Sequence, residues 1–140
     1  MKNINFFAKR KKCTAFAILK TDSTGIYINQ IPINNIEPKL MKDKIYAALS
    51  YTESSFSNLL EKININIKVN GGGVSSRTDA AIVCIMNCIL QYLKTQTDDD
   101  EWGRKLKEFD RSVLVPDVRR KMRKTILGQG ARSKEQKSYR

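Results

Sequence analysis

Histidine is absent from the 140 residues, and cysteine is scarce. Without an imidazole, the chain can have no mechanism that needs a histidine base or a histidine ligand for zinc. The three cysteines, Cys13, Cys84 and Cys88, are an odd number and form no C-x-x-C pair. This argues against a disulfide framework and a structural zinc site, and it favours a cytosolic or nuclear protein. Because Cys84 and Cys88 share one face of a helix, we expect them to be small apolar core residues.

Long hydrophobic runs are also missing. The longest apolar stretch spans residues 80–93 and already contains Asn87 and Gln91. A helix of that length rises about 21 Å, which is short of the ~30 Å hydrocarbon core of a bilayer. The basic start of the chain has no apolar segment of the kind found in a secretory signal. We therefore expect neither a membrane span nor a secretory signal.

Motifs for nucleotide or metal chemistry are absent too. Gly71, Gly72 and Gly73 precede a predicted helix, but the segment matches neither G-x-x-x-x-G-K-[ST] nor G-x-G-x-x-G. We interpret the three glycines as a tight strand-to-helix turn or a close backbone approach. The acidic run at residues 98–101 lacks the spacing of a calcium loop, so we interpret it as a solvated loop. The sequence thus predicts no catalytic residue, no cofactor and no metal site.

Positive charge is what the chain has in excess. It carries 26 Lys and Arg against 14 Asp and Glu, a net charge of +12. Residues 1–20 hold six basic residues and no acid, and residues 119–140 hold nine basic residues and one acid, whereas the part between has a net charge of −2. A near-neutral body with two cationic ends suits a partner with closely spaced negative charges. Nucleic acid is the first such partner to consider.

Apolar residues make up 41% of the chain, enough for one core. We expect one globular domain over residues 1–118, with a basic N-terminal segment, followed by a tail over residues 119–140. The tail has only scattered apolar residues, so we expect it to fold onto a partner. Its arginines can bind phosphate and stack on bases, and Tyr139 offers a further stacking ring.

Hydrophobic periodicity predicts the elements of the body. Strands are expected over residues 13–19 and 26–28, joined as a hairpin, and the cleanest alternation predicts a strand over residues 63–69. Helices are expected after Pro38, from the glycines to about Thr95, and around Leu106. The apolar run at residues 113–115 is a candidate last strand. The long helix is apolar on most sides, so the sheet should cover it.

Several segments, in order along the chain, resemble motifs of one protein family. They are residues 9–15 (KRKKCTA), 36–38 (IEP), 68–73 (KVNGGG), 109–115 (FDRSVLV), 117–120 (DVRR), 130–132 (GAR) and 136–140 (QKSYR). The chain resembles the ninth universal small-subunit ribosomal protein family, in its eukaryotic cytosolic form. The match at residues 136–140 is the most specific, whereas the triple glycine alone would be weak.

The resemblance implies an α+β fold with a four-stranded sheet backed by helices and a left-handed β-α-β crossover, the ribosomal protein domain 2-like fold. It implies a non-enzymatic structural protein in the head of the small ribosomal subunit, in the cytoplasm, with assembly beginning in the nucleolus. The implied partners are small-subunit ribosomal RNA, peptidyl-site transfer RNA and neighbouring ribosomal proteins of the head. No membrane and no small-molecule substrate are implied.

The resemblance also implies roles for individual residues. The implied contacts to ribosomal RNA are Arg10, Lys11, Lys12, Arg119, Arg120, Arg132, Lys134 and Lys137. Tyr139 and Arg140 are the implied transfer RNA contacts, and Gly71, Gly72 and Gly73 form a structural turn. The alternative hypothesis is a free nucleic-acid-binding or small nucleotide-binding protein that uses the glycine turn as an anion site.

Overall fold

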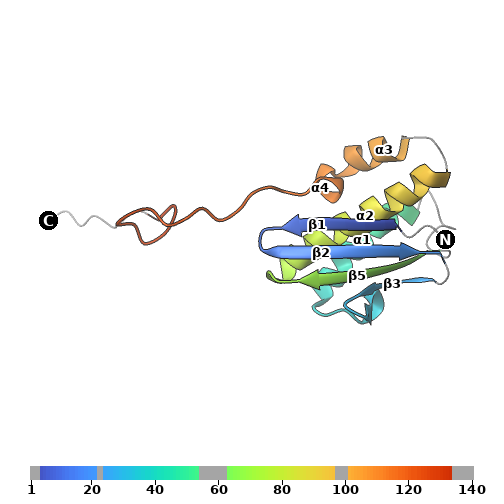
Figure 1. Ribbon diagram of the computed structural model, residues 1–140, viewed down its shortest axis with the longest axis horizontal. Helices are drawn as coiled ribbons and strands as arrows, with labels where there is room; N and C mark the ends of the chain where they lie inside the picture. The colour runs from blue at the N-terminus through green and yellow to red at the C-terminus, as the bar shows by residue number, and fades with distance from the viewer. Residues whose placement is uncertain (1–3, 22–23, 54–62, 97–100, 134–140) are drawn as a thin grey trace.

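A computed structural model describes residues 4–21, 24–53, 63–96 and 101–133. Helices pack on one face of a mixed five-stranded sheet with the strand order β1-β2-β5-β3-β4 (Figure 1). The strands are β1 (Ile4–Arg10), β2 (Cys13–Lys20), β3 (Gly25–Ile28), β4 (Ile31–Pro32) and β5 (Asn64–Asn70). The helices are the 3₁₀ turn η1 (Ile33–Asn35), α1 (Lys39–Glu53), α2 (Val74–Gln96), α3 (Glu101–Phe109) and α4 (Arg111–Leu114). The expected α+β class is confirmed, with five strands in place of four.

The predicted hairpin between β2 and β3 is wrong, because β5 lies between these two strands. β2 pairs with β5 antiparallel from Thr14 opposite Asn70 to Lys20 opposite Asn64. The shorter β3 pairs with the other edge of β5 in parallel, so α1 belongs to a β-α-β crossover between them. The handedness of this crossover stays a prediction.

The true hairpin partner of β2 is β1, which lies inside the predicted N-terminal basic segment. In β1 the side chains of Ile4, Phe6 and Ala8 alternate toward the core, while Phe7 and Lys9 are exposed. This period of two is the ordinary signal of a half-buried strand. The six cations among the first 20 residues obscure this alternation in the sequence.

Small side chains let α2 approach the sheet closely. Ala15 and Ala17 of β2 are fully buried, as are Cys84 and Cys88 on one face of α2, which packs against β1 and β2. The cysteines are free thiols, and burial raises the pKa of both Cys84 and Cys88 to about 12. The interpretation of these two cysteines as core residues is confirmed, and so is the sheet's cover over the long helix.

The predicted last strand at residues 113–115 is wrong, because Arg111–Leu114 forms the short helix α4. Asp110 caps this helix: its Oδ1 accepts a hydrogen bond from the backbone N–H of Ser112 at 2.7 Å. Asn87 on α2 donates from Nδ2 to the carbonyl oxygen of Leu114 at 3.1 Å, and Leu114 is buried. A cap and a helix contact therefore take the place of strand pairing.

Residues 115–133 contain no helix or strand, and Figure 1 shows this segment running away from the body. Large apolar side chains in it are open to solvent: Val118 is 87% exposed, Ile126 85% and Leu127 87%. These side chains therefore bury little apolar surface against the body of this chain. Within the described ranges, no helix has the length and apolar character needed to cross a membrane.

Candidate nucleic-acid interface

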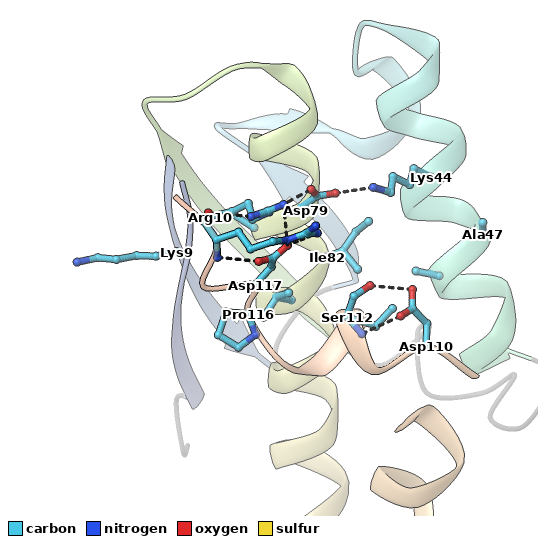
Figure 2. Close-up of a pocket in the computed structure, with 15 residues that line it drawn as sticks. Lys9, Arg10, Lys44, Ala47, Asp79, Ile82, Asp110, Ser112, Pro116 and Asp117 are labelled. Atoms are coloured by element: carbon cyan, nitrogen blue, oxygen red, sulfur yellow. Dashed lines mark hydrogen bonds and ion pairs between the residues drawn. The ribbon is translucent and has the colours of Figure 1, made fainter. Parts of the chain in front are cut away.

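Four charged side chains join the body to the start of the tail, and we call them the clasp: Arg10, Asp79, Asp117 and Arg119. Arg10, at the end of β1, lies 2.9 Å from Asp117 Oδ2 through one guanidinium nitrogen and 3.6 Å from Asp79 Oδ2 through Nε. Arg119 reaches the same oxygen of Asp117 at 2.7 Å, and Asp79 on α2 also pairs with Lys44 of α1 (Figure 2). The clasp therefore ties the chain after α4 to two other elements.

Asp117 is the centre of the clasp. It accepts bonds from the Arg119 side chain and from the Arg119 backbone N–H, each at 2.8 Å. These two bonds, with the charge of Arg10 beside them, lower the pKa of Asp117 to about 2. The same partnership raises the pKa of Arg119 above its ordinary value. The pair is fully ionised at neutral pH, so the clasp is a set of charge-assisted hydrogen bonds.

The two guanidinium groups in the clasp have different surroundings. The Arg10 side chain is only 14% exposed and also donates to the carbonyl oxygen of Arg119 at 3.4 Å. The Arg119 side chain is 84% exposed, so it keeps open surface for a further partner. Arg10 is thus held as part of the scaffold, while Arg119 faces solvent.

A cleft of about 330 Å³ lies beside the clasp, between β1, α1, α2 and the chain after α4 (Figure 2). Its carboxylates are already engaged: Asp79 and Asp117 pair with cations, and Asp110 accepts from Ser112. In the described ranges, no group of three or more metal-ligating side chains comes together. The cleft therefore presents a structural ion-pair network.

A second, open hollow of about 850 Å³ joins the two basic ends of the described chain. Among the described residues, its lining contains six cations and no carboxylate, and the cations are Arg10, Lys11, Arg119, Arg120, Lys121 and Arg132. Five of these six are residues that the resemblance implies as RNA contacts. We call this surface the cationic hollow. Because Arg10 and Arg119 already pair with Asp117 in the clasp, the cations that it offers to a phosphate backbone are chiefly Lys11, Arg120, Lys121 and Arg132.

The remaining predicted site residues lie in three places. Lys12 is exposed in the β1–β2 turn, beside Lys11. Gly71, Gly72 and Gly73 form the turn between β5 and α2. The other predicted contacts fall outside the described residues: Lys134, Lys137, Tyr139 and Arg140.

The glycine turn packs against the hairpin of β1 and β2. Gly71 and Gly72 have φ angles of +73° and +67°. A Cβ at Gly71 would lie 2.8 Å from the Lys12 carbonyl oxygen, and one at Gly72 would lie 2.9 Å from Cys13 Cβ. Arg77, from the first turns of α2, donates through Nε to the Gly71 carbonyl oxygen at 3.1 Å. The prediction of a close backbone approach is confirmed, and nothing here favours an anion site.

Sequence reasoning missed the partners of Arg10. The pairing of Asp117 with Arg119, two residues later, is a local signal that the sequence itself offers. The pairing of Arg10 with Asp117 had no such signal, because the two residues are far apart along the chain. Only the docking of α4 beside the end of β1 brings them together.

Comparison with known proteins decides the family. A sequence profile described as ribosomal protein S9/S16 matches residues 8–140, almost the whole chain. The chain belongs to this family. A small ribosomal subunit protein uS9 from Picrophilus torridus is 35% identical over 132 residues, covering 94% of this chain and 93% of its own. The uS9 protein of Methanothrix thermoacetophila is 35% identical over all 140 residues, with 100% of each chain covered.

A third relative comes from yeast. The protein uS9A of Saccharomyces cerevisiae is 34% identical over 142 aligned residues, covering 99% of this chain and 96% of its own. Membership of the S9/S16 family confirms the prediction of a non-enzymatic ribosomal protein. The archaeal and yeast relatives match equally well, so the comparisons support the family rather than its eukaryotic form.

Proposed function

We propose that this S9/S16 family chain is a structural constituent of the small ribosomal subunit head, in its eukaryotic cytosolic form, and binds small-subunit ribosomal RNA. The observation that carries the proposal is the cationic hollow, where six cations from both basic ends meet and the described lining holds no carboxylate. In this proposal, its neighbours in the head are other ribosomal proteins. The protein acts in the cytoplasm, and its assembly into the subunit begins in the nucleolus.

Charge neutralisation is the proposed mode of RNA binding. Lysines and arginines that contact phosphates release condensed counterions, which makes the affinity depend steeply on salt. The exposed side chains of Lys11, Lys12, Arg119, Arg120 and Arg132 supply these contacts. Arg10, held by Asp79 and Asp117, fixes the direction in which the tail leaves the body. Such phosphate contacts position the protein on RNA without reading its sequence.

The tail extends this function to transfer RNA. We divide the chain into a body over residues 1–118 and an RNA-threading tail over residues 119–140. In this division Lys134 and Lys137 continue the contacts to ribosomal RNA. Tyr139 and Arg140 reach the peptidyl site, where the ring stacks and the guanidinium contacts the transfer RNA backbone.

Sedimentation of a native lysate tests the ribosomal assignment. The chain should travel with small subunits on a density gradient and remain there after a high-salt wash. Its presence at the top of the gradient at both salt concentrations would overturn the proposal. A free nucleic-acid-binding protein would then be the better description.

Shortening the tail tests the transfer RNA contact. Deletion of Tyr139 and Arg140 should leave incorporation into subunits intact and weaken transfer RNA binding at the peptidyl site. The matched control is Arg104→Gln, which removes one exposed cation from α3 on the body. If subunits that carry the full-length chain and the shortened chain bind transfer RNA with equal affinity, this part of the proposal is contradicted.

A further inference from the structure

The sheet has a second face that none of the helices in the described ranges covers. Figure 1 looks onto this face, with β1, β2, β5 and β3 in front and α1 and α2 behind them. Along the strands, every second side chain points into the core, and the side chains between them point to this second face. Among them, Phe7 is 53% exposed and Phe16 40% exposed. We call this surface the open sheet face.

Its aromatic rings lie side by side across neighbouring strands. Phe7 of β1 stands directly opposite Phe16 of β2, and Phe16 stands opposite Lys68 of β5. One strand further, Tyr27 of β3 is the partner of Asn66 of β5 and is partly exposed. Exposed aromatic side chains on a sheet are unusual without a partner, because burying them is strongly favourable.

The charge of the open sheet face has one sign. The five strands contain no aspartate and no glutamate, while Lys9, Lys20 and Lys68 alternate onto this face and are exposed. The Nζ atom of Lys9 lies 5.2 Å from the centre of the Phe7 ring. Aromatic rings and cations therefore occur together on the open sheet face. Its positive charge and its exposed rings complement a polyanion that also carries flat apolar groups.

We propose that the open sheet face binds a single-stranded segment of RNA, with bases stacked on Phe7 and Phe16 and the backbone held by Lys9, Lys20 and Lys68. Single-stranded RNA is the partner that presents phosphates and unpaired bases together, and sheets that carry aromatic side chains recognise it in this way. An acidic protein would satisfy the lysines, whereas single-stranded RNA brings a flat base with every phosphate. The inference rests on the proposed function, to which it adds a second RNA surface made of other residues than the cationic hollow.

The test compares ring stacking with apolar contact in the full chain. The variants Phe7→Leu and Phe16→Leu, alone and together, keep an apolar side chain but remove the ring. Binding to a twelve-nucleotide single-stranded RNA is measured by fluorescence anisotropy over a range of salt. We expect the double variant to bind at least tenfold more weakly, since both rings on which bases stack are lost. The slope of affinity against salt should stay unchanged, because no cation is lost.

Two control variants make the result specific. Leu40→Ala removes an apolar side chain that is 76% exposed on α1, away from the open sheet face, and should bind like the wild type. Phe16→Tyr keeps a stacking ring and should retain most of the affinity. Circular dichroism of each variant shows that the fold is kept. Ultraviolet crosslinks to bases should map to Phe7 or Phe16 in the wild type.

The outcomes separate this inference from the proposed function. If the chain sediments with small subunits while the leucine variants bind RNA like the wild type, the open sheet face is no RNA platform and the ribosomal assignment stands. If those same variants then fail to enter subunits, a protein partner covers the face and the inference is overturned. If the rings bind RNA but the chain stays off the subunits, the ribosomal assignment fails while the inference survives.

Discussion

At Gly71 the backbone leaves no room for a side chain. Its φ of +73° is strained for any side chain, and a Cβ there would lie 2.8 Å from the Lys12 carbonyl oxygen. We expect Gly71→Ala to lower the free energy of unfolding by about 1–3 kcal/mol, because it combines left-handed strain with a backbone clash. Urea unfolding of the purified chain measures this. Gly73→Ala is the matched control, since a Cβ there meets nothing within 4 Å. Equal losses at both positions would contradict the explanation.

Asp117 provides a prediction in pH. Its pKa of about 2 lies below the ordinary 3.8, with the Arg119 side-chain hydrogen bond as the main cause. A carboxylate with a lowered pKa stabilises the folded arrangement above its ordinary pKa, and this stabilisation is lost as the pH falls toward 2. Carboxyl carbon shifts measured by NMR should show Asp117 titrating near pH 2. In Arg119→Gln the pKa should rise toward 3.8, whereas Arg120→Gln should leave it unchanged. An unchanged pKa in Arg119→Gln would contradict the bond assignment.

At the scale of elements, sequence patterns predicted the strand and the helix that have a clear local pattern. They failed where contacts distant in sequence determine the structure. The alternation of Ile65, Ile67 and Val69 predicted β5 to within one residue, and the apolar periodicity predicted α2. The pairing of β2 could not be read in this way, because strands adjacent in sequence need not be adjacent in the sheet. Residues 113–115 were ambiguous because a short apolar run fits a strand or a buried helix equally well.

The N-cap of α4 is a testable reason why this segment forms a helix and not a strand. Asp110 accepts from both the backbone N–H and the side-chain hydroxyl of Ser112, at 2.7 and 2.8 Å. We expect Asp110→Ala to lower the free energy of unfolding by about 1 kcal/mol, as for other N-cap residues. It should also speed amide hydrogen exchange at Val113 and Val115, whose N–H groups bond within this turn. Ser112→Ala keeps the backbone cap and should have a smaller effect; an equal or larger effect would contradict the capping role.

At the scale of the whole molecule, the composition located the positive charge along the chain but not its arrangement in space. The excess of cations at both ends was visible in composition, and the resemblance to the family added the residue roles. The meeting of Lys11 with Arg120 and Arg132 around one hollow is a tertiary fact. It depends on the β1–β2 turn and on the docking of α4, neither of which the sequence patterns predicted. The inward role of Arg10 depends on the same packing.

This arrangement predicts how RNA affinity divides between hollow and body. Arg120→Gln with Arg132→Gln removes two exposed cations from the hollow, and the control Lys39→Gln with Arg104→Gln removes two from α1 and α3. Each lost phosphate contact should lower the slope of log affinity against log salt by about 0.7–0.9. In salt titrations against a fragment of small-subunit ribosomal RNA, the hollow variant should lose about 1.4–1.8 in slope and the control almost none. Equal losses would mean that net charge alone attracts RNA and that the hollow has no special role. A loss confined to the hollow variant would show that RNA binds at the hollow, where Arg120 and Arg132 lie beside Lys11 of the N-terminal end.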